Sequence, residues 1–168
     1  SRTELEHSTE KILTYKDKYR PDKAVSSYND YNDRALEREI RKKTIVHACG
    51  KDPVLGESPV FIGCDNYCIT QVSNPADDRS FARYMAEKLG GKAIVTGIDP
   101  MDDEIAWAVE KVRRNADSIV MCTYNMHLKK GQQRLLQKLA TLGLPMTVVA
   151  MRNPYDLKML PEGVTGIE

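Results

Sequence analysis

From residue 44 onward, short apolar runs alternate with stretches in which apolar residues recur every three or four positions. Short runs rich in β-branched residues predict buried strands, and the longer spacing predicts amphipathic helices. The predicted strands are residues 44–48, 59–64, 92–98, 118–123, 145–151 and 164–167. The predicted helices run from Asp77 or Asp78 to Leu89 and over residues 102–116 and 132–142, with a short helical turn at 155–159. Strands that are apolar throughout and separated by helices predict an α/β fold, a three-layer α/β/α sandwich with a mainly parallel sheet.

The first part of the chain has a different pattern. Residues 3–19 are charged and helical in their spacing, residues 22–33 are polar and typical of a linker, and residues 35–43 resume a helical pattern. We therefore expect an N-terminal helix and linker over residues 1–34, followed by the sandwich over residues 35–168. The chain begins with Ser1, and the last predicted strand runs almost to Glu168. For these reasons we expect a piece of a longer protein.

Composition excludes several classes of protein. The chain has 168 residues, with 25 Lys and Arg against 24 Asp and Glu, which leaves a net charge of +1. This balance argues against a nucleic-acid-binding protein, whose surface is normally strongly basic. No apolar run approaches the roughly eighteen residues of a membrane-spanning helix. With 41% hydrophobic residues, the composition is that of an ordinary globular domain.

The four cysteines do not indicate a metal site. Cys49 and Cys122 adjoin or lie within apolar runs, so we expect both to be small core residues. Cys64 and Cys68 are three residues apart, but no paired histidine motif completes the four ligands that structural zinc requires. The chain also lacks the glycine-rich motifs that bind dinucleotides or nucleotide phosphates. We therefore expect neither a metal nor a cofactor.

Polar residues gather in the loops that follow the predicted strands. In an α/β sheet, ligands bind beyond the carboxyl ends of the strands, so these loops are the candidate site. Their polar groups could hydrogen-bond a sugar or another polyol. The candidates are Asn125, His127, Gln132, Arg152, Asn153, Tyr155 and Asp156. Structural roles compete with this interpretation, because Asn153 or Asp156 can cap the following helical turn and Asn125 can stabilise a tight loop.

No catalytic group can be identified from the residues. A glycosidase needs two carboxyl groups that face each other across the sugar. The adjacent acids Asp77-Asp78 and Asp102-Asp103-Glu104 both open predicted helices, where we expect them to act as caps. No serine lies in a nucleophile elbow, and Cys122 lies inside an apolar strand, where a reactive thiol is not expected.

Two segments carry a resemblance to a known family. Residues 116–133 read ADSIVMCTYNMHLKKGQQ and residues 145–160 read PMTVVAMRNPYDLKML. The distinctive combinations are Thr123-Tyr124-Asn125 with His127-Leu128 and Gly131-Gln132, and Arg152-Asn153-Pro154-Tyr155-Asp156-Leu157. The chain resembles the C-terminal α/β sandwich domain of family 3 glycoside hydrolases, in the bacterial β-N-acetylhexosaminidase (β-N-acetylglucosaminidase) branch. Residues 8–19 and 35–46 are similar to the segments that lead from the preceding barrel domain into the sandwich.

The resemblance implies an enzyme that removes terminal β-N-acetylglucosamine from cell-wall or chitin-type saccharides by a retaining mechanism. In this family the aspartate nucleophile lies on a TIM-type barrel, which needs roughly 250 residues. In this branch the acid/base is a histidine within a Lys-His-Phe-Pro-Gly-His type motif, and nothing here matches that motif. The chain is therefore expected to be inactive alone and to pack on the barrel of the same parent protein, where it shapes the sugar pocket.

Other interpretations stay open. A lone sandwich can be a non-catalytic carbohydrate-binding or dimerisation module, and an independent hydrolase is a third reading. The resemblance implies a bacterial protein and leaves open whether it lies inside or outside the cytoplasm and whether it forms a homodimer.

Overall fold

The computed structural model describes residues 2–19, 30–64 and 80–168. The chain divides into two compact units, Ser1–Arg41 and Lys42–Glu168. The first contains α1 (Arg2–Lys18) and most of α2 (Asp30–Thr44). The apolar side chains of α1, among them Leu5, Ile12 and Leu13, are exposed.

The helix predicted at residues 3–19 is confirmed, whereas the linker predicted at 22–33 is wrong at its end. Residues 22–29 lie outside the described part of the chain, and α2 already begins at Asp30. The polarity of residues 30–33 is typical of a linker, but a helix can begin on polar residues. The helix therefore starts five residues before the predicted position.

The second unit is built on a six-stranded sheet with strand order β1-β6-β5-β4-β2-β3. The strands are β1 (His47–Cys49), β2 (Pro59–Cys64), β3 (Lys92–Thr96), β4 (Ser118–Thr123), β5 (Met146–Ala150) and β6 (Thr165–Ile167). All neighbouring strands are parallel except β1 and β6, which pair antiparallel. The predicted, mainly parallel sheet is confirmed.

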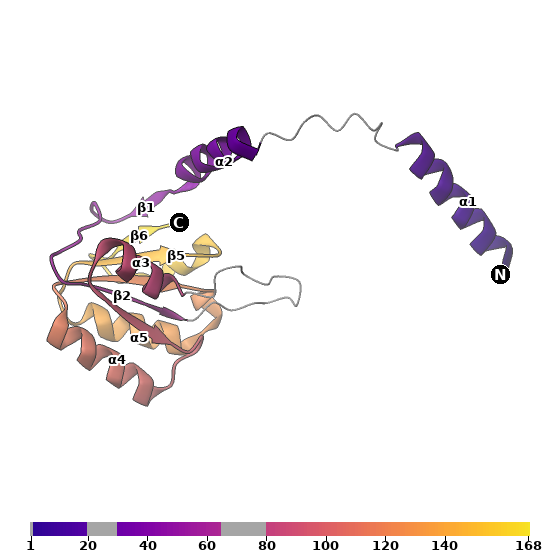
Figure 1. Cartoon of the computed structure of the whole chain (residues 1–168). Coiled ribbons are helices and arrows are strands. Elements are labelled where there is room, and N and C mark those ends of the chain that lie inside the picture. Colours follow the sequence, from indigo (N-terminus) through magenta and orange to yellow (C-terminus); the bar gives the residue numbers. More distant parts are fainter. Residues whose placement is uncertain (1, 20–29, 65–79) are drawn as a thin grey trace. The chain divides into compact units, whose positions relative to one another are not determined.

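Helices cover the two faces of the sheet unequally, as Figure 1 shows. One face carries α3 (Phe81–Leu89), which packs on β2 and β3, and the other carries α4 (Asp102–Asn115) and α5 (Lys130–Ala140). These layers form the α/β/α sandwich. Side chains along β4 alternate between the layers, because Ile119 and Met121 face α4 and α5 whereas Val120 faces α3.

The main core lies between the sheet and the α4–α5 layer. Ile105 and Val112 of α4 and Leu135 and Leu139 of α5 are fully buried or nearly so. Their spacings of seven residues in α4 and four residues in α5 place them on one side of each helix. The core on the α3 face is smaller, and its fully buried side chains include Phe61 and Ala82.

Three local expectations are corrected. Cys49 is exposed because β1 is a short edge strand that begins at His47, three residues later than predicted. Helix α4 begins after Met101 with no side-chain cap, so Asp102 to Glu104 supply negative charge to the first turn but no N-cap. Asp77 and Asp78 lie outside the described residues, and Ser80 caps α3 by accepting a hydrogen bond from the Arg83 amide at 3.3 Å.

Among the described residues, no helix is long and apolar enough to cross a membrane.

Candidate functional site

Two loops meet at the carboxyl ends of β4 and β5. The first contains the 3₁₀ turn η1 (Met126–Leu128), and the second contains the 3₁₀ turn η2 (Pro154–Met159). Parallel neighbours place the ends of these strands at the same edge of the sheet. From β2 the chain continues to its neighbour β3 and then crosses to β4, on the other side of β2. The strand order therefore reverses between β2 and β4. Such a topological switch point is where α/β folds bind ligands.

A buried carboxylate joins the two loops. Asp156 is 0% exposed, and its Oδ2 accepts a hydrogen bond from the Thr123 hydroxyl at 2.8 Å. Its Oδ1 accepts from the His127 amide at 3.0 Å and lies 2.8 Å from Nδ1 of the same residue. Burial raises the pKa of the Asp156 carboxyl, but the hydrogen bonds from His127, Met126 and Thr123 outweigh it and hold that pKa below its ordinary value.

His127 is the group that this carboxylate orients. A carboxylate only accepts hydrogen bonds, so the proton of a neutral imidazole lies on Nδ1 and Nε2 is the basic atom. The imidazole packs edge to face on Tyr155, with ring centroids 5.8 Å apart, and its side chain is 27% exposed. This arrangement presents a fixed imidazole edge that can exchange a proton or bind a polar ligand.

Gln132 fixes the start of the first loop. Its side-chain amide donates to the carbonyls of Ile98 at 2.7 Å and Tyr124 at 3.1 Å, and its carbonyl accepts from the Tyr124 amide at 3.1 Å. The residue is buried, and these bonds connect the segment after β3 to the residue after β4. Gln132 therefore holds the loop in place, since its polar atoms already have partners inside the protein.

The remaining candidates connect the loops nearer the surface. Asn153 Nδ2 donates to Asn125 Oδ1 at 2.8 Å, and Asn153 Oδ1 caps η2 by accepting from the Tyr155 amide at 3.1 Å. Asn125 adopts the left-handed conformation at φ 52°, which Asn tolerates better than most residues. Arg152 donates to the Tyr124 hydroxyl at 2.5 Å and lies over that ring. The structural roles considered for Asn125 and Asn153 are thus both present.

The structure brings all seven sequence-predicted residues into this pair of loops or the helix that follows. They separate into two groups by exposure. Gln132 and Asp156 are buried, whereas Arg152 and Tyr155 are exposed and the others are half-buried. The buried pair supports the loops, and the rest form the accessible surface.

The comparisons with known proteins bear on this arrangement. The structure is similar to that of a glycoside hydrolase family 3 beta-N-acetylglucosaminidase from Paenibacillus sp. str. FPU-7, with a TM-score of 0.73 and 19% sequence identity. The chain shares the fold of part of this enzyme. The match covers 99% of this chain and 34% of that chain, so the chain spans about a third of the glycosidase. No family model and no curated protein matches the sequence.

The seven candidates predicted from the sequence leave out several residues that complete the contacts of the site. Thr123 and Tyr124 complete the contacts of Asp156 and Arg152, although each pair is about 30 positions apart in the chain. Thr123 and Tyr124 belong to the Thr123-Tyr124-Asn125 combination that carries the family resemblance, but no local pattern placed them in the site. Gly131 was likewise unexplained, but a Cβ there would lie 2.2 Å from the Pro100 carbonyl oxygen, and its amide donates to Asp99 at 2.6 Å. The start of α5 therefore requires glycine.

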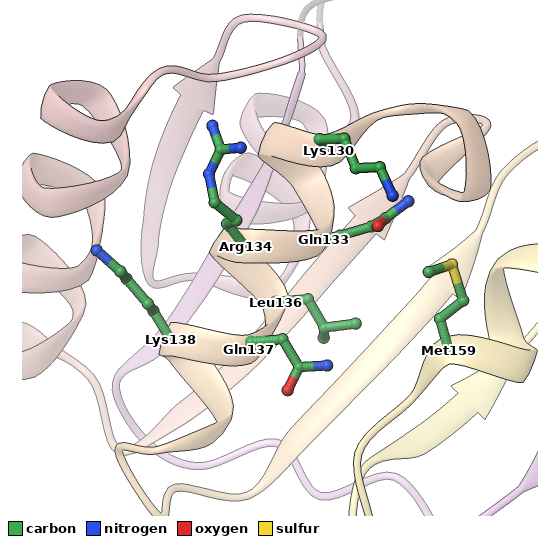
Figure 2. Close-up of a pocket in the computed structure, with 7 residues that line it drawn as sticks. All are labelled: Lys130, Gln133, Arg134, Leu136, Gln137, Lys138 and Met159. Atoms are coloured by element: carbon green, nitrogen blue, oxygen red, sulfur yellow. The ribbon is translucent and has the colours of Figure 1, made fainter.

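A cavity of about 540 Å³ lies beside α5, behind the same loops (Figure 2). Figure 2 shows Gln133 and Leu136 on the side of α5 that faces Met159, the last residue of η2, whereas Lys138 points away. Gln133 also donates to the carbonyls of Met126 at 2.8 Å and His127 at 3.2 Å. The cavity thus shares a supporting residue with the loop surface but lies outside it.

The described residues form no metal centre, and the Cys122 thiol in β4 is not reactive. No group of three His, Cys, Asp or Glu side chains gathers there to hold an ion. Burial and the neighbouring Cys64 raise the pKa of the Cys122 thiol to about 12, which leaves it protonated and unreactive at neutral pH.

Proposed function

We propose that this chain is the C-terminal α/β sandwich domain of a family 3 glycoside hydrolase that removes terminal β-N-acetylglucosamine by a retaining mechanism. One observation carries the proposal: nearly the whole chain is similar in structure to a third of a glycosidase of that family. The sequence segments that resemble the family also contain the two loops at the carboxyl ends of β4 and β5.

The catalytic groups belong to another part of the protein in this proposal. The nucleophile and the acid/base lie on a TIM-type barrel, and residues 1–34 lead from it into the sandwich. This chain contributes the rim of the sugar pocket, and alone it does not turn over substrate. The substrates are cell-wall or chitin-type saccharides, whose hydroxyl and acetamido groups match the donors and acceptors at the loop surface.

Each loop residue has a defined part in that rim. Arg152 and Asn153 donate hydrogen bonds to sugar or acyl oxygens, while Asn125, His127 and Tyr155 line the seam with the barrel. The contacts among them already exist in the chain, so little ordering is needed when the surface meets the sugar or the barrel. Gln132 and Asp156 act indirectly, by holding the loops.

The first test is to read the coding sequence upstream of Ser1. A barrel that carries a catalytic aspartate there supports the proposal, whereas a start codon immediately before Ser1 contradicts it. The second test uses the protein that includes the barrel, with an aryl N-acetylglucosaminide as substrate. We expect Arg152→Ala to raise KM roughly tenfold with little change in kcat, because the lost hydrogen bond is present in both the bound substrate and the transition state.

A matched control separates this effect from a general loss of charge. Arg114 on α4 is also exposed and bonds Glu110 at 2.6 Å, and it precedes β4 whereas the loops follow the carboxyl ends of β4 and β5. Arg114→Ala should leave both kinetic constants unchanged. Equal KM and kcat values for the two variants would show that Arg152 does not contact the substrate.

The alternative is a carbohydrate-binding module that works without a barrel. The preassembled loop surface is the observation that favours it. Titration of the chain alone with N-acetylglucosamine oligomers distinguishes the two functions. Tight binding that depends on Arg152 supports the module, and no binding supports a pocket that needs the barrel.

A further inference from the structure

The α3 face of the sheet contains an apolar groove that the candidate site does not use. Its volume is about 500 Å³, and its lining includes Phe81, Met85 and Leu89 of α3 together with Val120 of β4 and Val149 of β5. Half-buried and exposed apolar side chains contribute to it, so the groove is open at the surface. A volume in this range is typical of a small-molecule site.

The groove exists because the connections of the sheet leave half of this face without a helix. Helix α3 packs mainly on β2 and β3. The connection from β5 to β6 contains only η2, and its residues Leu157 and Met159 pack against the core on the opposite face. Among the described residues, nothing corresponds on the α3 face to the second helix that covers the α4–α5 face (Figure 1).

One wall of the groove carries an unsatisfied carboxylate. Glu168 belongs to the lining, and its backbone is held by hydrogen bonds with Val46, in which its amide donates at 3.0 Å and its carbonyl accepts at 2.7 Å. Its Oε2 is buried and has no hydrogen-bond partner among the described residues. A buried carboxylate oxygen without a donor costs free energy, so a ligand that supplies one gains affinity there.

The charge of the lining selects the kind of ligand. Among the described residues that line the groove, Glu168 is the one with an acidic side chain, and none is Lys, Arg or His. An anionic head group would meet the carboxylate with the same charge, whereas an ammonium would donate to it directly. The rest of the lining is apolar apart from Thr147, which favours a hydrophobic body.

We propose that this groove binds a small amphiphilic cation, with its apolar body between α3 and β5 and its ammonium group on Glu168. The lining reaches Met151, next to Arg152, but contains none of the seven residues of the candidate site, and occupation of the groove does not depend on glycosidase activity. The two proposals can therefore fail independently.

The test is calorimetric titration of the chain with two probes of similar apolar body and opposite charge, 1-naphthylmethylammonium and 1-naphthoate. We expect the ammonium to bind roughly tenfold or more tightly than the carboxylate, which is the range of a hydrogen bond to a charged group. Glu168→Gln should remove most of this preference. The matched control Glu162→Gln, which changes an exposed carboxylate in the turn before β6, should retain it.

A second variant tests the place of binding. Val149→Phe enlarges a half-buried side chain in the lining and should weaken both probes severalfold, with the fold checked by circular dichroism and thermal unfolding. Equal affinity of the two probes for the unchanged chain, or absence of binding by both, would overturn the proposal. So would a preference for the ammonium that survives in Glu168→Gln.

Discussion

The two faces of the sheet differ in how far this chain alone completes them. On the α4–α5 face, two helices bury a continuous core that includes Ile105, Leu135 and Leu139, and the β5–β6 connection closes its end with Leu157. On the α3 face, one helix covers part of the sheet and the remainder forms an open apolar groove.

The difference shows that burial in a sandwich follows the connections rather than the strands. Strands β4 and β5 contribute apolar side chains to both faces, but within residues 80–168 the α3 face has one helix and the opposite face has two. The closed face should therefore carry most of the stability, while the open face has apolar surface left over for recognition.

The largest expected effect compares the same substitution on the two faces. Leu139 is 0% exposed in the closed core, so Leu139→Ala should lower the free energy of unfolding by about 3 kcal/mol. Leu89 is 51% exposed at the groove, and Leu89→Ala should cost less than about 1 kcal/mol. Chemical denaturation of both variants provides the measurement. Similar losses would show that the two faces contribute equally.

The next effect concerns the hydrogen bonds of the buried Asp156 carboxylate beside the same core. Asp156→Asn places an amide where Thr123 and His127 donate to a carboxylate, and we expect a loss of about 2 kcal/mol. Asp102 is 79% exposed on its side chain, and its pair with Arg134 is weak, so Asp102→Asn should change stability by about 0.5 kcal/mol or less. Denaturant unfolding at neutral pH measures both changes in the free energy of unfolding. Equal changes in the two variants would contradict the expectation.

Acid should weaken the stabilisation that the Asp156 carboxylate provides. Because the pKa of Asp156 is lower in the folded chain than in the unfolded chain, its stabilisation is complete above the unfolded pKa of about 4. It is lost as the pH falls from there through the lowered folded value. Denaturant unfolding measured from pH 6 down to pH 3 should thus show a steeper decline for the unchanged chain than for Asp156→Asn. Parallel declines would exclude Asp156 from the acid response.

The smallest effect is expected on the open face. Glu168→Gln removes a charge whose Oε2 has no partner among the described residues, so it should raise the free energy of unfolding by about 1 kcal/mol or less. Thermal unfolding at neutral pH is sufficient to detect the sign. A clear destabilisation would indicate that the carboxylate is already satisfied in solution.

Local patterns predicted most of the elements in the second unit. The apolar runs at β2 and β4 and the three-to-four spacing in α4 and α5 are properties of neighbouring residues, and the sequence displays them directly. The antiparallel pairing of β1 with β6 is different, because it joins residues 47–49 to residues 166–167 and no local signal specifies it. Cys49 was misjudged for the same reason, since its exposure depends on the edge position of β1.

The sequence could predict that the candidate residues gather at one edge of the sheet, but not how their side chains interact. The rule that ligand sites lie in loops after strand ends selected residues that the structure places in or near η1 and η2. Asp156 is buried and Arg152 is exposed because the loop after β5 places the Asp156 carboxylate against Thr123 and His127. These are tertiary contacts, and no local pattern in the sequence predicts them. The open groove was also invisible, because apolar patterns do not show which strand face lacks a helix.

The β1–β6 pairing has a consequence for the time course of folding. In that pair, the earliest strand of the second unit is held by the latest, and Thr165 further bonds the Lys51 carbonyl at 2.8 Å. During synthesis, β1 leaves the ribosome with no sheet neighbour until more than a hundred further residues have followed. Chains stalled before β6 would therefore expose an unpaired strand, and the sheet should close only after β6 has been synthesised.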